Sequence, residues 1–115
     1  MAQAVINPNA EVGRGVIVNS AAVVEHDVKV GDFAHISPNA TMGGVSRLGA
    51  LSHLGIGAIV IHCVSIGARA VVGAGAVVVR DIPDNVVAFG VPARVHRSFD
   101  PDCSQHKSVV RANHD

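Results

Sequence analysis

A histidine flanked by two carboxylates is the clearest candidate for chemistry in this sequence. The triplet is Glu25, His26 and Asp27, and a further histidine, His35, follows nine residues after His26. An imidazole titrates near neutral pH, so it can take a proton from an attacking hydroxyl or amine, and a neighbouring carboxylate can fix its tautomer. The alternative is that the triplet is a solvated corner of the fold, and the triplet alone favours that alternative.

The element that must position these residues is a repeat of six. From Ile6 onward, every sixth residue is aliphatic or methionine, for thirteen positions ending at Val78. The residue two places earlier is always small or valine, and glycine follows the large residue seven times. Residues two apart on a strand point to the same side, so both members of each pair face inward. A β-sandwich predicts alternation of period two instead, with turn signals every 8–12 residues or so.

One hexad therefore predicts one short strand and one corner, and three hexads close one triangular coil. We expect the glycine or asparagine after each large residue to adopt the left-handed backbone angles of the corner. Thirteen hexads give about four coils that stack at the usual strand spacing. The predicted fold is an all-β parallel β-helix built from hexapeptide repeats.

The repeat stops after Val79. Residues 81–85 are typical of a turn, and Val86–Val95 is apolar enough to fold back over the last coil as a closing segment. We expect one β-helix domain over residues 1–97 and a polar tail over 98–115 that is loose or forms a short helix.

Coils of three hexads predict which histidines stack. His53 lies three hexads after His35, so the two should lie about 4.8 Å apart on neighbouring coils. His35 precedes the inward residue Ile36 and should point outward. His62 shares the hexad position of His26, two coils further on. We interpret His53 and His62 as surface residues.

The sequence resembles the hexapeptide-repeat acyltransferases of the left-handed β-helix superfamily. The resemblance covers about residues 4–97 and is carried by the segments GVIVNSAAVVEHDVKVGDFAHISPNATMGG and RDIPDNVVAFGVPARV. It is similar to bacterial sugar acetyltransferases of the sialic acid O-acetyltransferase and UDP-amino-sugar N-acetyltransferase type. The resemblance, and not the periodicity, implies a left-handed coil, against the usual right-handed crossover.

The resemblance also implies an activity, namely acetyl-CoA-dependent O- or N-acetylation of a sugar or nucleotide sugar. Such relatives usually carry an N-terminal domain that binds the nucleotide sugar, and further coils. This sequence begins within what corresponds to their helix. The donor site is therefore better supported than the acceptor site.

The resemblance implies one catalytic set. His26 is the general base, an acidic neighbour assists it, and Gly44 donates a backbone N–H to the thioester oxygen. The alternative for Gly44 is a corner glycine, a role that Gly43 already fills. The whole set is His26, Glu25, Asp27, Asn19, His35 and Gly44.

A groove for the pantetheine arm of CoA is implied along later outward positions with small residues. Small residues there can equally serve only to relieve crowding. Arg80 and Arg94 are single cations suited to the phosphates of CoA, with a solvated arginine as the alternative. The positions assigned to the groove are Gly55, Gly57, Ala58, Gly73, Ala74 and Gly75.

Three other functions compete with this one. A γ-type carbonic anhydrase shares the fold and holds zinc with three interface histidines, which His35, His53 and His62 bring to mind, but no pair of the form H-x4-H occurs. A non-catalytic trimeric module that binds CoA or serves structure is a second alternative. An ice-binding β-helix needs a Thr-x-Thr array, whereas Thr41 is the single threonine. We expect no metal.

Composition excludes several partners. The 115 residues include nine basic and nine acidic side chains and 3% aromatics, so neither a basic stripe nor stacking residues favour nucleic acid. No apolar run approaches the ~20 residues of a membrane span, and from residues 1–11 we expect no signal peptide. We expect a cytoplasmic protein with Cys63 and Cys103 as reduced thiols, and one disulfide between them as the alternative.

The resemblance further implies a homotrimer, in which threefold packing of apolar and small faces places His26 beside a neighbouring subunit. The first coil should expose an unpaired edge and an apolar core end, because solenoids need caps. We expect a cover from end-to-end stacking of two trimers into a hexamer, from the tail 98–115, or from a partner chain. The residues at this end are Ala4, Ile6, Ala10, Val12 and Val16.

Overall fold

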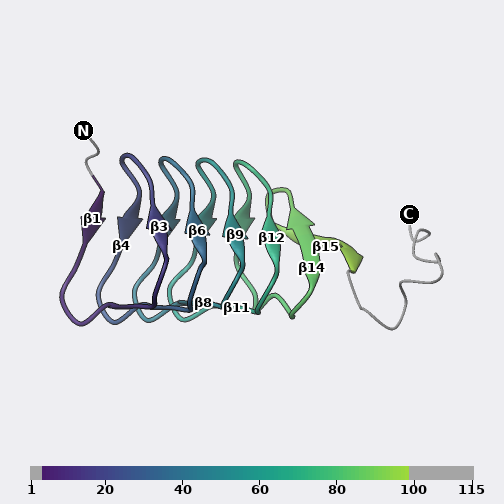
Figure 1. The fold of residues 1–115 in the computed structure, drawn as a ribbon. Coiled ribbons are helices and arrows are strands. Elements are labelled where there is room, and N and C mark those ends of the chain that lie inside the picture. The colour runs from purple at the N-terminus through teal and green to yellow at the C-terminus, as the bar shows by residue number, and fades with distance from the viewer. Residues whose placement is uncertain (1–3, 99–115) are drawn as a thin grey trace.

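The chain folds into a β-solenoid whose short strands wind around one axis (Figure 1). This is a computed structural model, and it describes residues 4–98. Strands recur every six residues up to Val78, and two longer strands follow. The strands are Val5–Ile6 (β1), Glu11–Val12 (β2), Ile17–Val18 (β3), Val23–Val24 (β4), Lys29–Val30 (β5), His35–Ile36 (β6), Thr41–Met42 (β7), Arg47–Leu48 (β8), His53–Leu54 (β9), Ile59–Val60 (β10), Ser65–Ile66 (β11), Val71–Val72 (β12), Val77–Val78 (β13), Val86–Phe89 (β14) and Arg94–Ser98 (β15).

Three sheets, parallel except where β15 pairs with β14, form the three sides of a triangular prism. The first sheet has the order β1-β4-β7-β10-β13, the second β11-β8-β5-β2, and the third β15-β14-β12-β9-β6-β3. Each strand of the repeat pairs with the strand three hexads later, as in Val5↔Val23 and His35↔His53. The predicted all-β parallel β-helix and its coil of three hexads are confirmed.

The core is a stack of aliphatic layers inside the prism. The large residue of each hexad and the small residue two places before it point inward, so that Val24, Ile36 and Met42 are fully buried. The large inward residues of the first coil are not buried, since Ile6 is 52% and Val12 38% exposed. The apolar core end that we expected there is therefore exposed, and within residues 4–98 no element covers it.

The corners are built differently from our expectation. Left-handed backbone angles fall three residues after each large residue from Ile6 to Val72, and they fall mostly on residues other than glycine, such as Phe33 (φ 59°), Val45 (φ 62°) and Cys63 (φ 63°). The prediction that the glycine directly after each large residue takes these angles is wrong. Four-residue turns with a positive φ at their third residue make each corner, as in type II turns.

The glycines after the large residues are required by close packing between coils. A Cβ at Gly31 would lie 2.5 Å from the backbone nitrogen of Ala50 on the next coil, and one at Gly55 would lie 2.6 Å from the carbonyl oxygen of Val72. Real Cβ atoms do not approach backbone so closely. Glycine therefore allows the corners to stack at the spacing that the strands impose.

The solenoid continues beyond Val79, where we expected the pattern to stop. Ile82 bridges to Ile66, and β14 stacks on β12 in parallel, with Val87 beside Val71 at a spacing that falls short of three hexads. β15 then pairs with β14 in the antiparallel direction. Ser98, assigned to the tail, is the last residue of β15, and the rest of that segment, with Cys103, lies outside the described residues.

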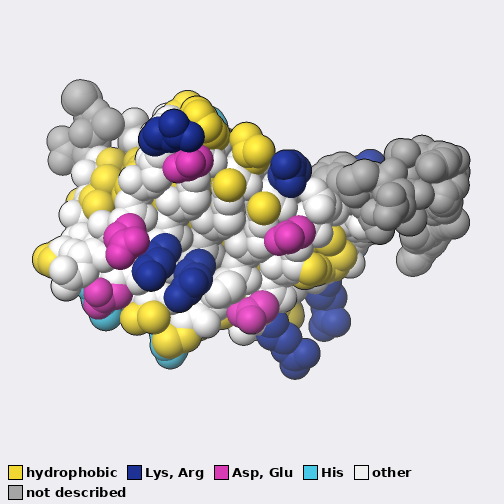
Figure 2. All heavy atoms as spheres, turned by 60° about the horizontal axis from the view of Figure 1, so that its bottom comes forward, with side chains coloured by type: hydrophobic (Ala, Val, Ile, Leu, Met, Phe, Trp, Pro, Cys, Tyr) yellow, Lys and Arg dark blue, Asp and Glu magenta, His cyan; other side chains and the backbone are white. Residues whose placement is uncertain are grey.

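The outward faces differ in character. The second sheet, turned forward in Figure 2, carries charged side chains, among them Glu11, Lys29 and Arg47 in neighbouring strands. The first sheet presents mainly apolar side chains, including Val5 and Ile59, which are 47% and 40% exposed. Among the described elements there is no helix that could cross a membrane.

Candidate functional site

The corner between the first and second sheets carries the central histidine. Stacking in register places His26, Gly44, His62 and Arg80 above one another, one on each successive coil, and we call this column the histidine corner. Backbone hydrogen bonds tie its coils together, since Val45 N–H donates to the carbonyl of His26 and Cys63 N–H to that of Gly44, each at 3.0 Å.

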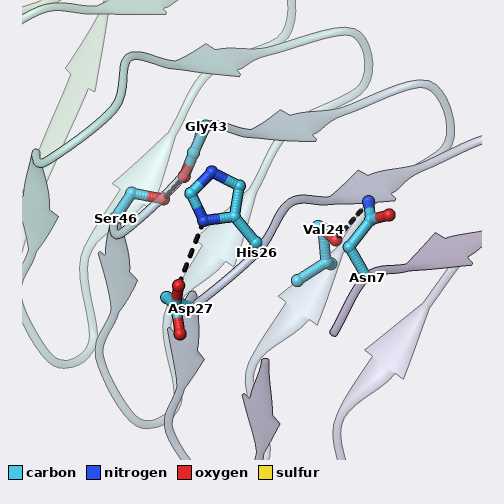
Figure 3. Close-up of polar contacts among 6 residues, drawn as sticks. All are labelled: Asn7, Val24, His26, Asp27, Gly43 and Ser46. Atoms are coloured by element: carbon cyan, nitrogen blue, oxygen red, sulfur yellow. Dashed lines mark hydrogen bonds and ion pairs between the residues drawn. The ribbon is translucent and has the colours of Figure 1, made fainter. Parts of the chain in front are cut away.

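His26 is held from one side and open on the other. Its Nδ1 lies 3.1 Å from Oδ2 of Asp27, the interaction drawn as a dashed line in Figure 3. Its Nε2 faces Gly44, where an added Cβ would lie only 2.8 Å away. When Nδ1–H donates to Asp27, Nε2 carries the free lone pair and can accept a proton.

Of the two carboxylates that flank His26, Asp27 makes the contact. Asp27 can do so because its backbone is left-handed (φ 59°), which turns its side chain back toward the preceding ring. Glu25 is half-buried where β4 ends, and its backbone N–H donates to the carbonyl of Met42. Sequence alone could not separate the two, because the angle at residue 27 is set by the corner and not by the triplet.

A second polar group lies on the third sheet. The amide of Asn19 donates to Nε2 of His35 at 2.8 Å. The ring of His35 lies against the ring of His53, with centroids 4.7 Å apart, which confirms the predicted stack. Ser37 Oγ lies 3.2 Å from Nε2 of His53.

His53 is a partly buried residue of the outer face. Its side chain is half-buried, and burial, followed by the charge of neighbouring His35, lowers the pKa of His53 below its ordinary value of 6.5. His53 lies on the outer face of the third sheet, as interpreted, and the spacing of three hexads to His35 was the signal for its contact. His62 is exposed, as expected.

A shallow groove of about 460 Å³ runs beside these two histidines. Three of the positions assigned to the pantetheine arm line it: Gly55, Gly73 and Ala74. Gly57 and Gly75 occupy left-handed corners next to it, and an added Cβ at either would meet open space. Ala58 was expected to face outward, but its side chain is fully buried in the core, because it is the small inward member of its hexad.

The two arginines assigned to phosphates come together. Arg80 and Arg94 line one pocket of about 350 Å³ at the end of the solenoid, together with Pro92 and Val95. Both are exposed, and within the described residues neither makes an ion pair. They can therefore offer two unshared cations to an anionic group.

The expected catalytic set is divided within one chain. His26, Asp27 and Gly44 lie on the histidine corner, whereas Asn19 and His35 lie on the third sheet, which is the side of the prism opposite that corner. His62 also lies on the histidine corner and not with His35 and His53. Within residues 4–98 of one chain, no three His, Cys, Asp or Glu side chains gather as metal ligands.

No protein-family model matches the chain. Among solved structures, PerB from Caulobacter crescentus in complex with CoA and GDP-perosamine is 40% identical, with a TM-score of 0.71 over 80% of this chain and 53% of PerB. The acetyltransferase domain of PglB from Neisseria gonorrhoeae is 34% identical, with a TM-score of 0.70 over 80% of this chain and 54% of that one. The same domain has been solved with acetyl coenzyme A.

Serine acetyltransferase from Neisseria gonorrhoeae is 25% identical, with a TM-score of 0.78 over 86% of this chain and 43% of that one. These neighbours are hexapeptide-repeat acetyltransferases, and this chain shares their left-handed β-helix and is similar to the sugar N-acetyltransferases among them. The resemblance drawn from the sequence is confirmed. The chain spans about half the length of the structures it matches.

Proposed function

We propose that this chain, with the fold of the hexapeptide-repeat acetyltransferases, transfers an acetyl group from acetyl-CoA to a hydroxyl or amine of a sugar or nucleotide sugar. The observation that carries the proposal is the arrangement of His26, with Asp27 on Nδ1 and Nε2 facing Gly44. Its support from relatives is that PerB binds CoA and GDP-perosamine and the PglB domain binds acetyl-CoA.

The residues of the histidine corner suit direct transfer. Acetyl-CoA supplies an acyl group on a thioester, with the CoA thiolate as leaving group. Nε2 of His26 takes the proton from the acceptor as the hydroxyl oxygen or amine nitrogen of the acceptor adds to the thioester carbonyl. Asp27 stabilises the imidazolium that forms. Gly44 N–H donates to the carbonyl oxygen as it becomes negative, and His26 returns the proton to the departing sulfur.

The decisive assay measures release of the CoA thiol from acetyl-CoA with a panel of amino sugars and nucleotide sugars. His26→Ala should lower turnover about 10²–10⁴-fold while CoA binding, measured by calorimetry, is retained. His62→Ala is the matched control, since His62 is an exposed histidine on the same corner. Full activity in His26→Ala contradicts the assignment, and CoA binding without turnover in the wild type indicates a non-catalytic module.

We further propose a homotrimer whose sites lie between subunits. The histidine corner and the third sheet lie on opposite sides of the prism, so His26 and His35 can meet only across an interface. The mainly apolar first sheet, with Val5 and Ile59 exposed, adjoins the histidine corner and suits such packing. Light scattering that shows a stable monomer at micromolar concentration would refute the trimer.

A mixing experiment tests the shared site directly. His26→Ala and His35→Ala chains should each be inactive as pure proteins. In trimers refolded from an equal mixture, about one quarter of sites combine an intact His26 from one subunit with an intact His35 from its neighbour. Recovery of about that fraction of wild-type activity supports the shared site. No recovery would show that each site lies within one chain.

A further inference from the structure

We infer that Ser46, a core residue, is a positioning residue that holds the backbone N–H of Gly44 toward the reacting group; the inference rests on the proposed function. The inward position two residues before each large residue carries alanine or valine in most hexads. Ser46 and Ser52 are the hydroxyl-bearing exceptions, and they are 0% and 1% exposed. A hydroxyl in such a place needs a partner within the fold.

The partner of Ser46 is the carbonyl oxygen of Gly43. Ser46 Oγ–H donates to it at 2.5 Å, as Figure 3 shows, and Ser46 N–H donates to the same oxygen at 3.2 Å. In a planar trans peptide the C=O and the next N–H point in opposite directions. Holding the Gly43 carbonyl in the turn therefore directs Gly44 N–H away from the turn, at a residue whose added Cβ would lie 2.8 Å from Nε2 of His26.

The Gly44 N–H is left without an acceptor within the described residues. On the corner between the second and third sheets, two of the equivalent N–H groups are capped, because those of Arg14 and Ala68 each donate to an aspartate Oδ1 at 2.8 Å. The N–H of Gly44 is thus available, whereas two coils of the other corner close the same donor with a carboxylate. An oxyanion donor has to be available in this way.

The hydroxyl matters because the peptide lies between two glycines. Glycine restricts neither of the torsions that rotate the Gly43–Gly44 peptide, so the turn alone leaves its orientation loosely fixed. A second hydrogen bond on the Gly43 carbonyl opposes that rotation. Ser52 makes the same bond to the carbonyl of Gly49, but on the corner away from His26. Ser52 therefore provides a control whose side chain has the same burial and bonding on a corner that carries no His26.

The neighbouring coils supply an isosteric test. Val28 and Val64 occupy the inward positions stacked directly below and above Ser46, so a β-branched side chain suits this column. Ser46→Thr keeps the hydroxyl, and Ser46→Val introduces a side chain of the same shape as threonine but without the hydroxyl. We expect Ser46→Val to lower kcat at least tenfold with KM for acetyl-CoA nearly unchanged, and Ser46→Thr to restore kcat. Ser52→Val should keep wild-type kcat.

A second readout does not need turnover. With ¹⁵N-glycine labelling, the Gly44 amide should give one sharp resonance in the wild type and Ser46→Thr, and broaden or split in Ser46→Val. Wild-type kcat in Ser46→Val overturns the inference while the proposed function stands. An unchanged Gly44 resonance in Ser46→Val overturns it as well, whether or not an acceptor is found. A wild-type chain that turns over no acceptor refutes the proposed function, and the resonance still decides whether Ser46 holds the peptide.

Discussion

Two adjacent glycines should respond to the same substitution in opposite ways. An added Cβ at Gly43 would lie 2.7 Å from His62 N and from the carbonyl oxygen of Val60, both backbone atoms of the next coil. The three atoms nearest to an added Cβ at Gly44 all belong to the side chain of His26, an exposed ring that can give way. Gly43→Ala should therefore damage the fold, and Gly44→Ala should damage the chemistry.

The magnitudes follow from these contacts. Gly43→Ala has to push two coils apart, and overpacking of this kind costs about 1–3 kcal/mol. For Gly44→Ala, an ordinary non-bonded separation is about 3.5 Å. Nε2 of His26, which would lie 2.8 Å from the new methyl group, must therefore retreat by about 0.7 Å. A shift of that order at a catalytic base costs roughly 10–100-fold in rate.

Urea unfolding and the thiol-release assay, run on both variants, separate the two effects. Gly44→Ala should unfold within about 1 kcal/mol of the wild type, because alanine also restricts the unfolded chain, and should lose most of its kcat. Gly43→Ala should show a clearly lower unfolding midpoint. Full kcat in Gly44→Ala, or wild-type stability in Gly43→Ala, would refute the reasoning from these contacts.

Three further predictions concern other parts of the structure. Burial and a neighbouring histidine lower the pKa of His53 below 6.5, so the unfolded chain binds a proton at this residue more readily than the folded chain does. The free energy of unfolding should therefore fall as the pH drops below 6.5. In the variant His53→Gln this fall should be smaller. Val45 is β-branched, 48% exposed and has a left-handed backbone. Val45→Gly should therefore raise the free energy of unfolding by about 0.5–1 kcal/mol in a urea titration. Val79 is a similarly exposed valine without a positive φ, so Val79→Gly should lower the free energy of unfolding. Replacing both Arg80 and Arg94 by alanine should raise KM for acetyl-CoA several-fold and leave KM for the acceptor unchanged. An unchanged KM for acetyl-CoA would show that this pocket does not bind the donor.

The sequence predicted the coil because one simple rule, a large inward residue every six positions, repeats without interruption. That rule carries no information about corner angles, which is why the left-handed positions were assigned to glycine and not to residues such as Phe33 and Val45. It also failed at the end of the solenoid, since β14 joins the stack at a spacing shorter than three hexads, which breaks the period. Long-range spacing stayed informative, as the contact between His35 and His53 shows.

The candidate site was predicted less completely than the fold. The residue types were found, and Asp27 and Gly44 lie beside His26 as expected. Position within a hexad, however, does not show which side of the prism a residue occupies relative to the rest of the site. That requires counting hexads in threes. The separation of His35 from His26 follows from such a count, since nine residues equal one and a half sides of the triangle.

The register of three hexads per coil also determines what lengths of chain the fold can gain or lose. An insertion of three hexads after Gly44 would add one coil and return every later residue to its own side of the prism. An insertion of a single hexad would preserve each inward and outward position and the core, yet rotate all later residues by one third of a turn. Arg80 would then leave the line of His26 while the protein remained folded. Lineages of such solenoids should therefore tolerate length changes in whole coils and lose function through single hexads.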